Sequence, residues 1–304
     1  MRILSVGVAV IDYVFHVEHF PRLAEKYRAL DAEVVGGGGG ANAAVAAARL
    51  GAESWVAART GADTAGDAIR DDLRGEGVRL DMLYRAAGKR SSFSSVLING
   101  EGERQIVNFR DTDLPTDAGW MRERLGAMEA NGEGFDAVVV DTRWVEGSMV
   151  AVEHARVRGA PAVMDVEAPA HEGLEALEAC THAVFSAQGL RDFVGRDGPL
   201  DDLLAEADGR VEAVVGVTDG PEGVRWIENG ELHRARPPAA PGPIIDTLGA
   251  GDVWHAALAL ALAEAQPLSD AMDFANAAAT LKCTGGGGRR SAPTRAAVEA
   301  LLAR

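Results

Sequence analysis

Cysteine is nearly absent from the sequence, and long apolar runs are missing. Its two cysteines are Cys180 and Cys283, no Cys-x-x-Cys occurs, and no Cys/His cluster has the spacing of a zinc site. We therefore expect two reduced thiols in the core rather than a disulfide framework or a structural metal. No run of about 20 apolar residues could span a bilayer, and the first residues lead into a strand-like segment rather than a signal peptide. These absences predict a cytoplasmic protein.

Basic residues are also scarce relative to acidic ones. There are 30 lysines and arginines against 46 aspartates and glutamates, which gives a formal net charge of −16 over 304 residues. This excess argues against nucleic acid or an anionic membrane as a general partner, although local basic groups can still bind an anion. At 47% hydrophobic residues the chain can bury a sizeable core, and its length fits one large domain or two.

Regular alternation of strand and helix patterns begins at Phe135. Strands are predicted at 137–140, 162–165, 183–186 and 211–217, with helices near 149–158, 173–180 and 201–207. This rhythm is typical of a parallel sheet with helices on both faces. A hairpin around Asn229-Gly230 follows, and further helices are predicted at 252–264, 268–283 and 294–303.

The N-terminal third predicts a second, smaller sheet. The β-prone segments 13–17 and 27–35 lie around a loop, and segments 92–98 and 103–109 flank the turn Asn99-Gly100-Glu101-Gly102. A hairpin amid β/α alternation favours a sheet set apart from the main one. The preceding apolar run, residues 3–11, predicts a buried strand that delivers Asp12 to its end.

The most informative stretch is the turn before the helix pattern at 252–264. Gly249, Ala250 and Gly251 let the backbone approach a ligand closely, and their amides with those of the new helix can form an anion-binding nest. Asp252 stands at the mouth of that nest, where it can accept the proton of an attacking hydroxyl. The combination predicts phosphoryl transfer. The alternative is an ordinary N-cap after a glycine turn.

A run of five glycines, Gly36 to Gly40, followed by Ala41 and Asn42, is a second candidate site. Gly36, Gly38 and Ala41 satisfy the Gly-x-Gly-x-x-Gly/Ala pattern of dinucleotide sites, so an NAD-dependent oxidoreductase is an alternative. A Walker loop is excluded because no Gly-Lys-Ser/Thr follows.

Residues 246–252 resemble the Asp-Thr-x-Gly-Ala-Gly-Asp signature of the ribokinase/PfkB family of carbohydrate kinases. Gly37, Gly38 and Asn42 match its Gly-Gly-x-x-x-Asn signature, and residues 217–223 look like its Val-Thr-x-Gly-x-x-Gly segment. The resemblance implies a single α/β domain over residues 1–304. Its core would be a ribokinase-like three-layer α/β/α arrangement with a mostly parallel sheet. A small β-sheet lid would form from about 12–35 and 91–113.

The family's site residues carry over to matching positions. Asp252 would be the base, and the amides of Gly249, Ala250 and Gly251 would hold the phosphoryl charge. The implied sugar-binding residues are Asp12, Lys26, Gly37, Gly38, Asn42, Asn108 and Arg143. Those implied for the nucleotide are Thr218, Gly220, Gly223 and Asn276.

The implied cofactors are ATP and Mg²⁺. The resemblance also implies a monovalent-cation site, for K⁺, at Asp246, the Leu248 carbonyl and the Gly285–Gly288 loop. The family's Asn-x-x-Glu magnesium motif is replaced here by Ser186-Ala187-Gln188-Gly189.

The likeness is greatest to the sulfofructose kinase and ketohexokinase branches. The ketohexokinase features are the Leu248 form of the signature, Ser186, and Lys282-Cys283. The sulfofructose kinase likeness lies at 33–38, 43–52, 102–104, 143–144, 182–186 and 279–284, with Asn108, Arg143 and Lys26 at sulfonate-binding positions. We therefore expect a ketose kinase, with sulfofructose as candidate substrate and a homodimer through the lid. The alternatives are fructose, ribose, ketodeoxygluconate, or a silent sugar-binding protein.

Overall fold

The computed structural model describes residues 1–101 and 103–304, and nine strands of this part form one large sheet. Its order is β13-β12-β11-β10-β9-β8-β1-β4-β5. The strands are β1 (Arg2–Val6), β4 (Glu53–Gly61), β5 (Leu83–Ala86), β8 (Ala137–Asp141), β9 (Ala162–Val166), β10 (His182–Ser186), β11 (Val214–Thr218), β12 (Val224–Glu228) and β13 (Glu231–Ala235). Pairing is parallel from β5 to β11 and antiparallel at the β12–β13 edge. The predicted mostly parallel sheet is confirmed.

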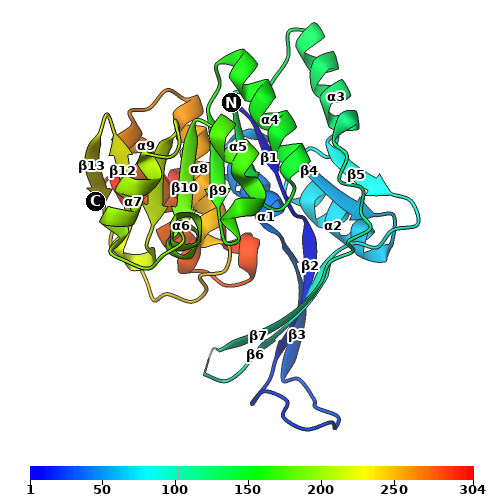
Figure 1. The fold of residues 1–304 in the computed structure, drawn as a ribbon. Coiled ribbons are helices and arrows are strands. Elements are labelled where there is room, and N and C mark those ends of the chain that lie inside the picture. Colours follow the sequence, from blue (N-terminus) through cyan, green and yellow to red (C-terminus); the bar gives the residue numbers. More distant parts are fainter. Residues whose placement is uncertain (102) are drawn as a thin grey trace.

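Helices cover both faces of this sheet (Figure 1). One face carries α1 (Gly39–Arg49), α8 (Ala250–Ala263), α9 (Leu268–Cys283) and α10 (Arg295–Leu302). The other carries α3 (Gly119–Ala130), α4 (Val145–Arg158), α5 (Leu174–Ala179), α6 (Ala187–Val194) and α7 (Leu200–Asp208), and α2 (Thr64–Gly75) packs near β4. In β8, Val138 and Val140 join one core cluster while Ala137 and Val139 join the other. Successive side chains point to opposite faces, so strands buried on both sides are apolar throughout.

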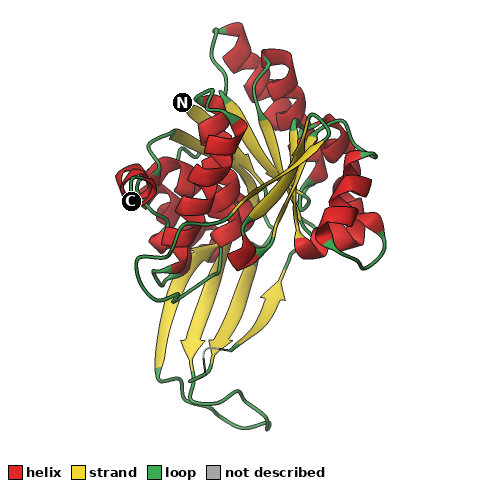
Figure 2. Cartoon of the chain, turned by 90° about the vertical axis from the view of Figure 1, so that its left-hand side faces the viewer, coloured by secondary structure: helices red, strands yellow, loops and turns green. Residues whose placement is uncertain are grey.

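Four strands of the described residues form a second sheet, ordered β3-β2-β6-β7, which we call the lid sheet. These are β2 (Val10–His16), β3 (Asp31–Gly37), β6 (Phe93–Ile98) and β7 (Arg104–Phe109). Figure 2 shows the lid sheet projecting from the helix-covered core. The separate small sheet and the three-layer core are both confirmed, and the predicted turn residue Gly102 lies outside the described residues.

The first strand differs from its prediction. β1 ends at Val6, and the chain then crosses from the large sheet to the lid sheet, where β2 begins at Val10. Asp12 is therefore the third residue of a lid strand rather than the end of a core strand. A side chain at Gly7, in the crossing, would meet the carboxylate of Asp141 at 2.0 Å. The apolar run 3–11 hid this break because both sheets need apolar residues there.

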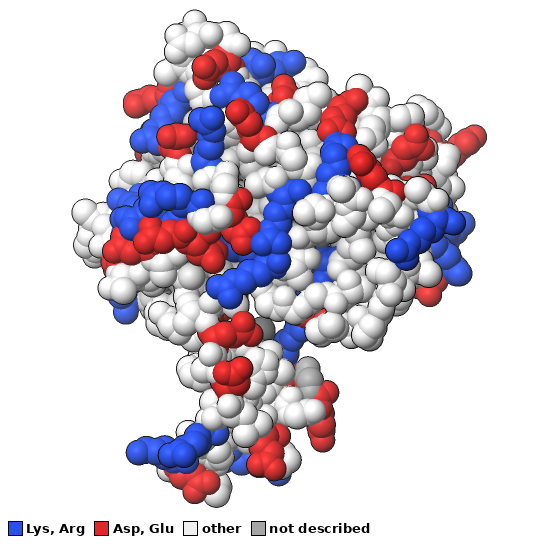
Figure 3. Space-filling model, turned by 180° about the vertical axis from the view of Figure 1, so that it is seen from behind, with Lys and Arg blue, Asp and Glu red and all other residues white. Residues whose placement is uncertain are grey.

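Helix boundaries show smaller differences. α1 starts at Gly39, inside the glycine run, and α9 has the predicted bounds of 268–283. β5, α3 and α6 were not predicted. In residues 1–101 and 103–304, no helix combines the length and apolar character needed to cross a bilayer. Figure 3 shows acidic and basic side chains interspersed over one face of the molecule.

Candidate active site

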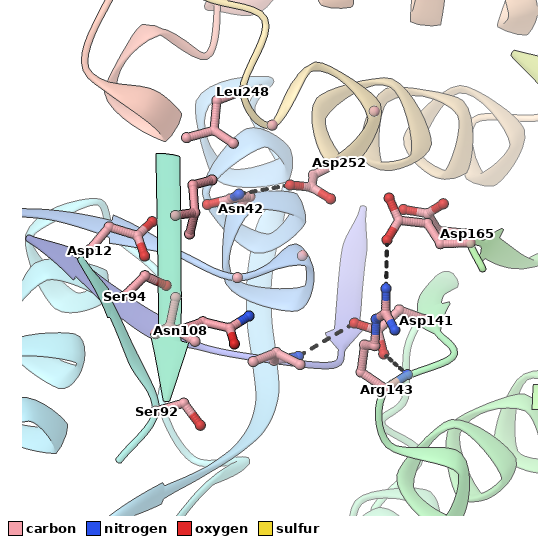
Figure 4. A pocket seen from close by; sticks show the side chains of 18 of the residues that line it. Asp12, Asn42, Ser92, Ser94, Asn108, Asp141, Arg143, Asp165, Leu248 and Asp252 are labelled. Atoms are coloured by element: carbon pink, nitrogen blue, oxygen red, sulfur yellow. Dashed lines mark hydrogen bonds and ion pairs between the residues drawn. The ribbon is translucent and has the colours of Figure 1, made fainter. Parts of the chain in front are cut away.

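A cavity of about 520 Å³ lies between the lid sheet and the carboxyl edge of the large sheet. Asp141, Asp165, Ser186 and Thr218 line it from the ends of β8, β9, β10 and β11. Ligands of open parallel sheets bind at this edge because the loops after successive strands leave a crevice there. The N-terminal ends of α1 and α8 close one side, and the lid sheet closes the other (Figure 4).

The turn from Asp246 to Asp252, called the 246–252 turn below, presents the start of α8 to this cavity. Gly249 adopts the left-handed conformation with φ 80°, which glycine reaches without strain, and α8 begins at Ala250. The amide of Ala250 donates to the Thr247 carbonyl at 3.2 Å, so it is not free for a ligand. Gly251 and Asp252 are first-turn residues whose amides have no intrahelical acceptor, and both residues line the cavity. Part of the predicted nest is therefore used internally.

Asp252 reaches into the cavity beside Asn42 of α1. The Asn42 side-chain amide donates to Asp252 Oδ2 at 2.7 Å (Figure 4). Burial raises the pKa of Asp252, while the Asn42 hydrogen bond opposes that rise and the charge of Glu167 adds to it. A carboxylate with a raised pKa is a stronger proton acceptor, which suits a general base.

Asn42 has one more polar atom to satisfy. Its Oδ1 is buried and has no hydrogen-bond partner in the part of the chain that the structure describes. Burying an unpaired acceptor is costly, so a ligand hydroxyl in the cavity would supply a missing partner. The expected sugar-contacting residue thus also orients the expected base.

Gly37 and Gly38 lie where the surrounding chain leaves no room for a side chain. A Cβ on Gly37 would stand 2.3 Å from Asp12 Oδ2, and one on Gly38, at φ 93°, would stand 2.4 Å from the Val8 carbonyl oxygen. The glycine run follows β3, an antiparallel lid strand, and opens α1 toward Asp252. A dinucleotide fingerprint requires a parallel βαβ unit at this point. The dinucleotide interpretation is therefore wrong.

The lid sheet contributes one row of polar side chains. Strand register aligns Asp12 with Ser94 and Ser94 with Asn108, so all three share the face that lines the cavity (Figure 4). Burial raises the pKa of Asp12, while the Ser94 hydroxyl and the charge of Arg289 oppose that rise. Lys26, expected beside them, is instead exposed on the loop between β2 and β3 and does not line the cavity.

Arg143 follows β8 and lines the cavity, as expected, but it already has partners. Its guanidinium donates to Glu167 Oε2 at 3.1 Å and to the Ala168 carbonyl at 3.3 Å. A carboxylate from the loop after β9 therefore already pairs with Arg143, and its expected contact with a substrate anion stays a prediction.

Sequence reasoning missed the acidic groups beside Asp252. Asp141 and Asp165 are cross-strand partners at the ends of β8 and β9. Burial raises the pKa of Asp141 to about 6, and burial with the nearby Glu167 charge raises that of Asp165 well above its ordinary value. His255 Nε2 lies 3.7 Å from Asp165, and burial lowers the pKa of this imidazole. A single aspartate at the end of each apolar strand was the available signal.

The expected nucleotide residues divide into two groups. Thr218 lines the cavity at the end of β11, whereas Gly223 packs so closely on β13 that a Cβ would meet the Ala235 carbonyl at 2.1 Å. Gly220 begins a short 3-10 turn between them. Asn276 is buried. Its side-chain oxygen accepts from Trp254 Nε1 at 2.9 Å, and its side-chain nitrogen donates to the Ala235 backbone carbonyl at 3.1 Å. The expected contact of Asn276 with the nucleotide stays a prediction.

The expected monovalent-cation residues are already occupied by protein groups. Asp246 accepts from the Leu248 amide at 2.9 Å, and the ammonium of Lys282 contacts its backbone carbonyl at 2.8 Å and its carboxylate at 3.2 Å. Arg104 of β7 bonds the other carboxylate oxygen at 2.5 Å and so joins the lid sheet to the 246–252 turn. Protein donors thus already contact the backbone carbonyl and both carboxylate oxygens of Asp246.

Comparison with known proteins gives one consistent result. The profile of a family described as pfkB family carbohydrate kinase matches residues 1–295. A ribokinase of Bacillus subtilis (strain 168) is 29% identical over 302 residues, covering 99% of each chain. A crystal structure of a candidate ribokinase from Agrobacterium tumefaciens has a TM-score of 0.89 and 33% identity, covering 100% of this chain and 99% of that one. Arabidopsis thaliana ribokinase, in complex with ribose and ATP, has a TM-score of 0.85 at 24% identity over 99% of this chain and 98% of that one.

Proposed function

This chain belongs to the pfkB family of carbohydrate kinases, a family of phosphotransferases with an alcohol acceptor, and we propose that it transfers the γ-phosphate of ATP to the primary hydroxyl of a neutral monosaccharide. The main observation that supports this proposal is the position of Asp252. It combines a raised pKa, an orienting hydrogen bond from Asn42 and a place in the first turn of α8, all facing one cavity.

In the proposed reaction, Asp252 accepts the proton of the sugar hydroxyl as that oxygen attacks phosphorus. The amides of Gly251 and Asp252, at the positive end of α8, stabilise the charge on the phosphoryl oxygens. Phosphoryl transfer depends on such positioning and charge stabilisation more than on covalent chemistry by the protein. Asn42 holds the carboxylate in line with the hydroxyl.

The charge of the cavity supports a neutral sugar. The acidic residues that line it outnumber the basic ones; they are Asp12, Asp141, Asp165, Glu167 and Asp252, against Arg104, Arg110 and Arg143. Two of those arginines are paired with acids, Arg104 with Asp246 and Arg143 with Glu167. The polar row of Asp12, Ser94 and Asn108 offers hydroxyl-binding groups. The ribose found in the Arabidopsis thaliana complex is one such neutral sugar, and fructose is another.

ATP requires Mg²⁺, and the residues present fit it. Within residues 1–101 and 103–304, no group of three or more His, Cys, Asp or Glu side chains forms a metal cage. Mg²⁺ in kinases keeps several waters and takes one or two carboxylates besides the phosphates. We propose that Asp165 and Glu167 order those waters, because a divalent cation would relieve their crowded charge. The ion neutralises phosphate charge during transfer.

Sulfofructose is the second candidate substrate, favoured by one observation. Arg143 and Asn108 line the same cavity as Asp252, so a C6 sulfonate could displace Glu167 from the guanidinium. That exchange replaces one charge-assisted hydrogen bond of Arg143 with another. The sulfonate therefore gains less binding free energy than it would gain from an unpaired arginine.

A phosphorylation panel with Mg·ATP tests both candidates. It should contain ribose, fructose, sulfofructose, ketodeoxygluconate and nucleosides. We expect ribose or fructose to exceed sulfofructose in kcat/KM by about tenfold or more, since a charge-assisted pair must be broken for the anion. Arg143→Ala should then change that ratio little. A preference for sulfofructose that Arg143→Ala abolishes would establish the second candidate, and a panel without any phosphorylated sugar would overturn the proposal.

We also propose that two copies associate through the outer face of the lid sheet. Register places Tyr13, Val34 and Val107 in one row on that face, and they are 38%, 48% and 69% exposed. Exposed apolar rows of this kind are characteristic of protein interfaces. A lid-to-lid dimer would cover them while leaving the polar row facing the cavity.

A further inference from the structure

Lys282 is a fully buried ammonium in the last turn of α9. Its exposed fraction is 0%, a rare state for lysine unless the charge is paired. Nζ lies 2.8 Å from the Asp246 backbone carbonyl and 3.2 Å from Asp246 Oδ2. One cation therefore contacts both the backbone and the side chain of the first residue of the 246–252 turn.

The remaining hydrogen-bonding capacity of Asp246 is also taken. Oδ1 accepts from Arg104 at 2.5 Å and from the Leu248 amide at 2.9 Å, and Oδ2 accepts from the Gly288 amide at 3.2 Å. Asp246 is the residue at which the sequence predicted a monovalent cation. A K⁺ ion sharing its carbonyl and carboxylate would face the ammonium across the same two oxygens, and the two charges would repel.

We propose that the ammonium of Lys282 performs the work of a bound monovalent cation, so that this enzyme needs neither K⁺ nor NH₄⁺. The inference rests on the proposed kinase function and concerns how that site is kept in order. Lys282 is a positioning residue, because it acts through Asp246 and not on the substrate.

The connection from Lys282 to the reacting groups runs through two non-covalent contacts and a few residues of backbone. Lys282 holds Asp246, whose carboxylate holds the Leu248 amide and thereby shapes the turn. Gly249 follows in the left-handed conformation, and Gly251 and Asp252 then present their amides. Burial raises the pKa of Asp252, and Lys282 is one of the charges that oppose that rise. Loss of Lys282 should therefore disturb the turn and the base together.

The first test measures wild-type activity in salt. Turnover is followed at about 100 mM KCl and in tetramethylammonium chloride of equal ionic strength, so that screening is the same. We expect the two rates to agree. Several-fold activation of the wild-type enzyme by K⁺ would overturn the proposal.

The second test is chemical rescue of Lys282→Ala, which removes the ammonium and opens the space of its stem. We expect kcat to fall by roughly 10–150-fold, the worth of a charge-assisted contact, with the sugar KM little changed. KCl, NH₄Cl or methylammonium chloride should restore much of the loss. The matched control is Arg289→Met, which removes another buried cation of the same segment, paired with Asp72. The loss of activity in Arg289→Met should not respond to these salts. Equal rescue of both variants would contradict a specific role of Lys282.

A third readout needs no catalysis, which separates failure of this inference from failure of the kinase assignment. Rubidium anomalous diffraction should show no ion at Asp246 in wild-type crystals and one ion there in Lys282→Ala. K⁺ should also raise the melting temperature of Lys282→Ala but not of wild type. If Lys282→Ala does not fold, the wild-type crystals still decide, because rubidium bound at the Asp246 carbonyl overturns the proposal.

Discussion

Three aspartates at one end of the cavity have raised pKa values, because burial favours the protonated form of each. Asp141, Asp165 and Asp252 come from β8, β9 and α8, and burial raises the pKa of each. The charge of Asp252 contributes to the rise at both of the others. Acidic crowding of this kind costs stability at neutral pH and is kept where function needs it. The three aspartates are far apart in the sequence, and only the fold shows that they lie close enough to interact.

Asp141→Asn should make the protein more stable at neutral pH. The pKa of Asp141 rises from 3.8 to about 6 on folding, so the native state holds a proton that the unfolded chain has lost. Wild-type stability therefore falls as pH rises from about 4 to 6 and stays lowered above that. The variant should gain about 1–3 kcal/mol above about pH 6 and almost nothing near pH 4. Urea unfolding between these values tests this, and a pH-independent difference would contradict it.

Among the elements, β7 joins the lid sheet to the 246–252 turn. Arg104 bonds Asp246, and the lid row of Asp12, Ser94 and Asn108 faces the same cavity. The lid sheet is therefore linked through Arg104 to the turn from which α8 begins. Lids that exclude water and complete a site in this way are common in kinases.

Arg104→Met should loosen the lid sheet without disturbing the nucleotide end. A partly exposed ion pair contributes up to about 1 kcal/mol, so we expect the sugar KM to rise by about two- to fivefold with little change in the KM for ATP. Arg122→Met is the matched control, because Arg122 and Glu153 form an ion pair of the same 2.5 Å length far from the cavity. A rise in both Michaelis constants, or an equal rise in the control, would contradict a lid role.

The sequence predicted elements well where local pattern decides them. The 268–283 helix and the Asn229-Gly230 hairpin depend on apolar periodicity and turn chemistry, and both are present. Asp12 was misplaced because the apolar run 3–11, although broken by Gly7, continues across a crossing between two sheets. The pairing of Asn42 with Asp252, which are 210 positions apart, has no local signal at all. Likewise, charge counting cannot reveal that Glu167 already satisfies Arg143.

At the scale of the whole molecule, the core is closed while the lid sheet has one open apolar face. Helices cover both faces of the large sheet (Figure 2), whereas Tyr13, Val34 and Val107 are exposed side chains on the outer face of the lid sheet. The lid sheet thus presents a polar row to the cavity on one face and an apolar row to solvent on the other.

Val107→Lys should convert a dimer to a monomer. A charge at the β7 end of the apolar row, at its most exposed apolar side chain, would be desolvated on association, which is costly without a partner. Light scattering after size exclusion should give twice the chain mass for wild type and the chain mass for the variant. Val157→Lys is the matched control, since Val157 is 76% exposed on α4 of the core and should leave the dimer intact. A monomeric wild-type protein would contradict the lid interface.

The turnover of Asp252→Asn, measured together with its sugar affinity, tests the central claim most directly. Asparagine keeps the shape of the side chain and can face Asn42 with its oxygen, but it cannot take a proton. We predict normal folding, a sugar dissociation constant near that of wild type by calorimetry, and a fall in kcat of about 10²–10⁴-fold, the usual worth of a positioned base. A variant that keeps more than about half of the wild-type kcat would show that Asp252 is not the base.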